Sequence, residues 1–337
     1  MFKKRVQLVA VLCVGCLLFD PIIPEACFAS FNHPISVVPI TEELATQTFA
    51  LRPAWVFHLP EPIEMVVNNY RNGARVVLLG DPHPEIFEMI AYADFLKFLM
   101  SQLIKEAGLT CVYLEVSPGF MEQGLIPYIQ EWVNSNIQDL DEFQQKHGVT
   151  RSKTWYATER NYLPMLRVAH ENGLSLRGFD VRTGSQVAGA QIDEAFYSKI
   201  MESFDASLPA SRALIIAGTF HVGMHPNFPT LGSLFARQKD FQIKTIHVEV
   251  GVAAEDDARR DLRMVLRDSK IPTLSIENLM SSSLANVRVG NFPSIADIYG
   301  PLKLDLESYA RAFHQLIYFR SNRDLENYLR SFISKAV

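Results

Sequence analysis

Ionisable side chains follow four apolar runs of the sequence, each at the point where the run ends. They are Asp81, His83, Glu115, Asp180, Arg182, His221 and His225. Imidazole and carboxylate groups brought together can bind a divalent metal ion, or can act as general acid and base on a bound substrate. The sequence therefore predicts catalytic or metal-binding chemistry if the fold gathers these residues in one place.

Each of these residues also has an ordinary structural interpretation when it is taken singly. Glu115 can simply pair with Arg182, and Asp180 can cap a turn or a helix. His221 can be a buried core histidine, and His225 lies between a glycine and a proline, which predict a loop rather than a metal-binding helix. The interpretation as a functional site therefore rests on the recurrence of such residues after four successive apolar runs.

The segments between these residues alternate between strand-like and helix-like patterns. The predicted strands are short apolar runs, at Arg75–Gly80, Thr110–Val116, Leu174–Phe179, Ala213–Ala217, Phe241–Val250 and Gln315–Phe319. The predicted helices carry apolar residues at helical spacing, at Pro84–Ala107, about Gln191–Leu208 and Asn322–Ile333. Residues 119–160 interrupt the alternation with polar, helix-like segments.

This order of elements predicts an α/β fold with a mostly parallel central sheet, helices on both faces and a helical insertion after the second strand. Ligands of such sheets bind beyond the carboxyl ends of the strands. The ionisable residues lie at those ends, so we expect one crevice along that edge of the sheet.

The N-terminus has the pattern of a secretory signal peptide. A basic start at residues 1–5 precedes an apolar run at residues 6–19, shorter than the roughly 20 residues that span a membrane. We expect cleavage after Ala29, which leaves residues 30–337 as one domain exported to the periplasm or the extracellular space. An uncleaved membrane anchor and lipidation at Cys16 are the alternatives. Cleavage would leave Cys111 as the single cysteine, in an apolar run that predicts a buried side chain.

Composition excludes several classes of protein. The 337 residues are 48% hydrophobic and 20% charged, which is too apolar for a disordered chain. A formal net charge of −5 argues against nucleic acid as the partner and leaves a small molecule or a peptide as substrate. The sequence also lacks a P-loop, a dinucleotide-binding glycine motif, a G-x-S-x-G elbow and an H-E-x-x-H motif.

Two short motifs resemble those of a known group of proteins. Gly80-Asp81-Pro82-His83 and Gly218-Thr219-Phe220-His221 resemble the paired G-x-x-H motifs of the Tiki superfamily, and Glu115 fits the acid between them. That group includes TraB-like proteins, erythromycin esterase-like hydrolases and ChaN-like haem-binding lipoproteins. Arg177-Gly178-Phe179-Asp180 is similar to a G-F-D strand end of the esterase-like branch. The resemblance covers roughly Val76 to Val250.

The chain departs from this group at two positions. Asp81 stands where members often carry Glu, and His314 stands where relatives often have Asp in a terminal strand. These differences leave open a third interpretation, a protein that keeps the scaffold without activity.

The first hypothesis for function is hydrolysis of an ester or amide bond. In a metal-dependent version, His83, Glu115 and His221 hold a divalent ion whose bound water is the nucleophile. In a metal-free version, His83 is the general base on water, tuned by Glu115 or Asp81. His221 then orients the substrate or stabilises the oxyanion, and Arg182 binds an anionic substrate group.

The alternative hypothesis is haem binding, as the resemblance to ChaN-like lipoproteins implies. Tyr128 or Tyr156 of the insertion, or a histidine, would then be the axial ligand. Colour separates the two hypotheses: a haem-binding protein absorbs strongly near the violet edge of the spectrum, and a colourless preparation after titration with haem would exclude haem binding.

Overall fold

The structure, a computed structural model, describes residues 61–81, 90–147, 160–182, 191–225, 229–250, 271–279 and 312–336. The predicted signal peptide, Cys16, His83 and Tyr156 lie outside these residues. Within the described part, no helix is both long and apolar enough to cross a membrane.

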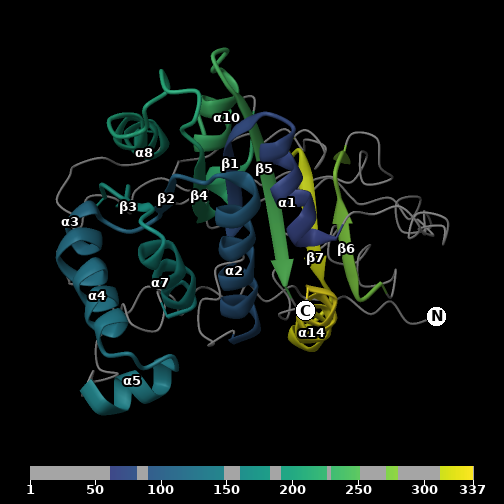
Figure 1. Cartoon of the computed structure of the whole chain (residues 1–337). Helices are drawn as coiled ribbons and strands as arrows, with labels where there is room; N and C mark the ends of the chain where they lie inside the picture. Colours follow the sequence, from purple (N-terminus) through teal and green to yellow (C-terminus); the bar gives the residue numbers. More distant parts are fainter. Residues whose placement is uncertain are drawn as a thin grey trace, which may run out of the picture. The chain divides into compact units, whose positions relative to one another are not determined.

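A seven-stranded sheet forms the centre of the described structure (Figure 1). Its strands are β1 Ala74–Asp81, β2 Cys111–Leu114, β3 Ser175–Gly178, β4 Ala213–Gly218, β5 Gln242–Val250, β6 Thr273–Ile276 and β7 Gln315–Phe319. They are ordered β3-β2-β4-β1-β5-β7-β6, and every neighbouring pair is parallel except β6 with β7. The predicted α/β fold is confirmed, and β6 is an antiparallel edge strand that the sequence pattern did not reveal.

Helices cover both faces of this sheet, because its central strands are apolar on both sides. Val77 and Leu79 of β1 face one core and Val76 and Leu78 face the other. The first core includes α1 Pro62–Arg71, α2 Ile90–Gln102 with its π-helical continuation η4 Leu103–Ala107, α7 Leu163–Glu171 and α14 Asn322–Ala336. The second core includes α8 Gln191–Met201, α9 Thr219–Val222 and α10 Leu231–Ala236.

The segment after β2 is helical, as predicted for the insertion. It contains α3 Pro118–Phe120, η5 Met121–Leu125, α4 Ile126–Asn134 and α5 Leu140–His147. Trp132 of α4 and Phe143 of α5 stack with ring centroids 6.1 Å apart and belong to the first core. The insertion therefore extends the layer of helices that contains α2 and α7.

The helix predicted to reach Leu208 ends at Met201 instead. Asp205 turns the following segment by accepting a hydrogen bond from the backbone N–H of Ser207, at 2.9 Å. The Arg75 guanidinium donates to the carbonyl oxygens of Asp205 and Ala206, at 3.1 and 2.7 Å. Because Arg75 lies on β1, far away in the sequence, this end of the helix is set by a contact that local periodicity does not contain.

Candidate active site at the carboxyl edge of the sheet

Four of the predicted residues lie together beyond the carboxyl ends of β2, β3 and β4. They are Glu115, Asp180, Arg182 and His221, and Asp193 of α8 joins them. We refer to these five residues as the His221 cluster. The parallel strands explain the meeting, since Glu115 continues β2 alongside β4 with its N–H donating to the Ile216 carbonyl at 3.2 Å.

Glu115 is the centre of the cluster. Its Oε2 accepts the backbone N–H of Gly218 at 2.8 Å, and its Oε1 accepts a hydrogen bond from Arg182 Nη2 at 2.9 Å. The same Oε1 lies 3.6 Å from His221 Nε2. The Glu115 side chain is only 8% exposed, so these contacts replace most of its hydration.

Arg182 links two carboxylates across the cluster. Its Nε and Nη2 donate to the two carboxylate oxygens of Asp180, at 2.9 and 2.7 Å, while Nη2 also reaches Glu115. The guanidinium lies 5.5 Å from the ring centroid of Phe196, a cation–π distance. With 44% of its side chain exposed, Arg182 is the residue of the cluster most open to solvent.

His221 is oriented by a buried carboxylate. Its Nδ1 donates to Asp193 Oδ1 at 2.9 Å, and the same oxygen accepts the backbone N–H of Leu231 at the start of α10. Burial lowers the pKa of His221, but the charges of Glu115 and Asp193 and the hydrogen bond to Asp193 outweigh it, so its pKa is raised overall. The imidazole is therefore held in one orientation and keeps its proton to higher pH than an exposed histidine.

The sequence did not single out Asp193, although its pattern contained a signal. Asp193, Phe196 and Ile200 are spaced three and four residues apart on α8, and all three are buried. An acid on the apolar face of a helix needs a partner inside the protein. This spacing in the sequence was the signal that Asp193 is a buried acid with a partner inside the protein.

Asp81 lies on the opposite face of the sheet from the His221 cluster. Along β1 it shares a face with Val77 and Leu79, and its Oδ2 accepts a hydrogen bond from the Tyr162 hydroxyl. Burial raises the pKa of Tyr162 well above 10, and the nearby Asp81 charge raises it further. The Asp81 backbone carbonyl accepts a hydrogen bond from Thr219 Oγ1 at 2.9 Å, which ties β1 to the helix that carries His221.

His225 lies beside the cluster rather than within it, and burial lowers its pKa more than the charge of Asp193 raises it. Its ring stacks on Phe220 with centroids 5.2 Å apart, and its backbone carbonyl accepts the Ser233 hydroxyl at 2.9 Å. Burial lowers the pKa of His225 to about 4, so the side chain is neutral near pH 7. Among the described residues its Nε2 has no hydrogen-bond partner, which fits a core histidine better than an acid–base group.

A second pair of ionisable residues lies on β5 and was not predicted from the sequence. His247 Nε2 is 3.3 Å from Glu249 Oε2, both side chains are buried, and the His247 ring stacks on Phe313 with centroids 5.1 Å apart. The pattern of Phe241–Val250 predicts only an apolar strand. The two polar residues at alternate positions near its end were the available signal for this pair.

The structure does not test the predicted metal site, because His83, one of its three ligands, lies outside the described residues. No group of three His, Cys, Asp or Glu side chains in the described residues could hold a metal ion. The Glu115 oxygen nearest His221 already contacts the Arg182 guanidinium, which supplies positive charge where an ion would lie.

Comparisons with known proteins do not assign a family. No family model matches the chain, and no curated protein matches it. Among solved structures, the type III effector HopBA1 is similar at a TM-score of 0.40 and 12% identity, over 78% of this chain and 97% of that one. ChaN of Campylobacter jejuni, described with cofacial haem binding, is similar at a TM-score of 0.33 and 16% identity, over 58% of this chain and 87% of that one. Likenesses this distant carry no argument about function, so the resemblance to the Tiki superfamily stays a prediction.

Proposed function

We propose that the chain hydrolyses an ester or amide bond at the His221 cluster, without a metal ion. The observation that carries this proposal is the position of His221 between two carboxylates, with Nδ1 on Asp193 and Nε2 facing Glu115. A carboxylate that orients an imidazole is a recurring device of acid–base catalysis, because it fixes which nitrogen faces the substrate.

His221 acts as the proton donor in this proposal. Its Nδ1–H is committed to Asp193, so the proton it can give lies on Nε2, at the side of Glu115. The carboxylates on both sides favour the imidazolium form. Nε2–H can therefore stabilise the oxyanion that forms when water attacks the carbonyl carbon, and then protonate the leaving group.

In this proposal Arg182 binds the substrate, and Glu115 positions Arg182 and His221. The exposed guanidinium offers charge-assisted hydrogen bonds to a carbonyl or carboxylate of the substrate. Glu115 keeps both Arg182 and His221 in place, as its contacts to each show. His83 remains the proposed general base that activates water, and it lies outside the described residues.

The test compares two histidines of the same chain. Full-length protein is assayed on a panel of p-nitrophenyl esters and anilides, as wild type, His221→Gln and His170→Gln. His170 is the matched control because its Nε2 contacts Gln130 at the surface, away from the strand ends. We expect His221→Gln to lower kcat by about 10²–10⁴-fold, with His170→Gln unchanged. A panel hydrolysed equally by all three proteins would contradict the proposal.

Haem binding is the second candidate function, and the same preparation tests it. Tyr128, one of its predicted ligands, packs edge-to-face on Phe143 within the insertion, with ring centroids 5.4 Å apart. Titration of the protein with haem decides the question: a stoichiometric shift of the haem absorption band would favour this function over hydrolysis.

A further inference from the structure

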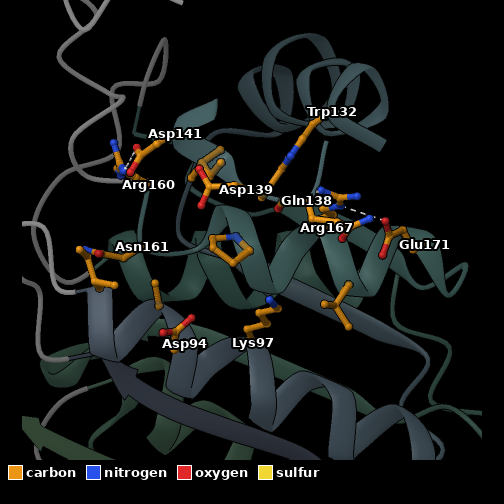
Figure 2. Close-up of a pocket in the computed structure, with 15 residues that line it drawn as sticks. Asp94, Lys97, Trp132, Gln138, Asp139, Asp141, Arg160, Asn161, Arg167 and Glu171 are labelled. Carbon is orange, nitrogen blue, oxygen red and sulfur yellow. Dashed lines mark hydrogen bonds and ion pairs between the residues drawn. The ribbon is translucent and has the colours of Figure 1, made fainter. Parts of the chain in front are cut away.

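A polar pocket lies between α2, α7 and the insertion, apart from the His221 cluster (Figure 2). Its volume is about 200 Å³, enough for a small organic molecule. Its walls come from α2, from α7 and the segment just before it, and from the segment between α4 and α5. Trp132 closes one end of it.

Two of the arginines that line the pocket are already neutralised by neighbouring acids. Arg160 pairs with Asp141, and Arg167 Nε pairs with Glu171 Oε1 at 2.9 Å (Figure 2). Arg167 also donates to the Ile137 carbonyl at 2.7 Å and stacks over Trp132 at 4.5 Å. These pairs form a rigid frame, so the charge left for a ligand comes from other residues.

The remaining charges are Asp94 and Lys97 of α2, with Asp139 on the opposite wall. Within the described residues neither the Asp94 nor the Lys97 side chain makes an ion pair or a hydrogen bond, although both line the pocket. Asp94 is half-buried, and this burial raises its pKa while the charge of Lys97 lowers it. A partly desolvated carboxylate without an ion-pair partner gains free energy when an ammonium group binds beside it.

We propose that this pocket binds a small zwitterionic amine of the free amino acid class. Asp94 and Lys97 are three residues apart on one helix, so their Cβ atoms lie about 5–6 Å from each other. A zwitterion offers each of these two charges a counterpart, an ammonium group for Asp94 and a carboxylate for Lys97. Asp139 on the opposite wall adds a second carboxylate toward the ammonium, beyond the oxygen that caps Glu142 N–H at 2.8 Å.

The pocket is joined to the His221 cluster by contiguous contacts. Asn161 lines the pocket, and the next residue, Tyr162, donates its hydroxyl to Asp81. The Asp81 carbonyl in turn accepts the Thr219 hydroxyl, two residues before His221. If a ligand moves the segment at Asn161, these contacts offer a route to His221, and this regulatory half of the inference rests on the proposed function of the cluster.

Calorimetry on the full chain tests the binding half. Alanine, leucine and lysine are titrated to about 10 mM, followed by the N-acetyl and the amide derivative of the one that binds most tightly. We expect binding of the free amino acid and at least a tenfold loss of affinity in each derivative, because each lacks one charge. Asp94→Asn and Lys97→Met should weaken binding about tenfold or more, whereas Glu64→Gln on the exposed face of α1 should not change it.

The absence of binding by all three amino acids would overturn the inference, and so would equal binding by the blocked derivatives or by Asp94→Asn. The regulatory half is read by the NMR signal of the His221 ring, assigned by its loss in His221→Gln. This signal should shift with ligand in the wild type and stay fixed in Tyr162→Phe, and a signal that ignores the ligand in both would refute the coupling. Hydrolysis is not used as a readout, so failure of the proposed function leaves the binding result interpretable.

Discussion

Glu115 and Asp81 both end strands that flank β4, yet the two acids lie on opposite faces of the sheet. Glu115 meets a guanidinium, an imidazole and a backbone N–H next to solvent-exposed Arg182. Asp81 is 1% exposed and meets the hydroxyl of Tyr162, with Tyr92 close by in the same core. One acid therefore belongs to a cluster of alternating charges, and the other to a sealed contact with phenols.

The difference between these acids shows that the end of a strand is not sufficient to predict a site. The face to which a side chain points decides what it meets, because successive residues of a strand point to opposite sides. The face covered by α8 gathers the candidate acid–base groups, and the face covered by α2 and α7 anchors helices on the sheet.

The largest effect should come from the acid that orients His221. Asp193→Asn keeps the size of the side chain but removes the charge that favours the imidazolium form, so His221 becomes a weaker proton donor. We expect kcat on the substrate identified by the ester and anilide panel to fall about 10²–10³-fold. Glu194→Gln, the next and exposed residue of α8, is the matched control. Equal activities of these two variants would remove Asp193 from the site.

The two histidines of the segment 221–225 should respond to pH in opposite directions. The folded pKa of His225 is lowered to about 4, so the unfolded chain binds a proton first and stability falls as pH drops from about 6.5 towards 4. This loss is about 3 kcal/mol for His225. The folded pKa of His221 is raised, so its contribution is present below the unfolded pKa and is lost as pH rises through the folded one.

Urea unfolding of wild type and His225→Asn at pH 7.5 and pH 4.5 measures the first of these effects. The wild type should lose more stability on acidification than His225→Asn does, by about 2–3 kcal/mol. His147→Asn, at an exposed histidine of α5, should lose as much as the wild type. His314, whose pKa burial also lowers to about 4, stays unchanged in all three proteins and cancels from the comparison. Equal losses of unfolding free energy on acidification in wild type and His225→Asn would show that the His225 ring is exposed to solvent in the folded protein.

A glycine behind the His221 cluster should be nearly irreplaceable. A Cβ at Gly232 would lie 2.0 Å from the Val222 carbonyl oxygen, where α9 and α10 approach each other. Gly232→Ala must therefore push apart the helices that carry His221 and the Leu231 N–H, at a cost of about 2–3 kcal/mol. Gly119→Ala is the control, since nothing lies within 4 Å of its Cβ position. Equal unfolding midpoints for these two variants would contradict this packing.

The alternation of apolar runs was enough to predict the sheet, its parallel strands and the edge at which Glu115, Asp180 and His221 meet. It was not enough to place Asp81, because nothing in one sequence says which helices cover which face. Asp193 was missed since a helix residue reaches the strand ends only after α8 packs on the sheet. The predicted end of α8 was wrong for a similar reason, because Arg75 of β1 binds the segment that follows the helix.

The smallest effect should come from the contact between Tyr162 and Asp81, on the face of the sheet that α2 and α7 cover. Tyr162→Phe removes the hydroxyl that donates to Asp81 and leaves the ring in its core position, so the unfolding free energy should fall by about 1–2 kcal/mol. Without added ligand, kcat should stay within about threefold of wild type, because the phenol does not touch the His221 cluster. Tyr197→Phe is the matched control, since its hydroxyl contacts Gln238 in a more exposed setting and should cost less. A loss of activity in Tyr162→Phe as large as in Asp193→Asn would erase the division between the faces and make Asp81 part of the catalytic machinery.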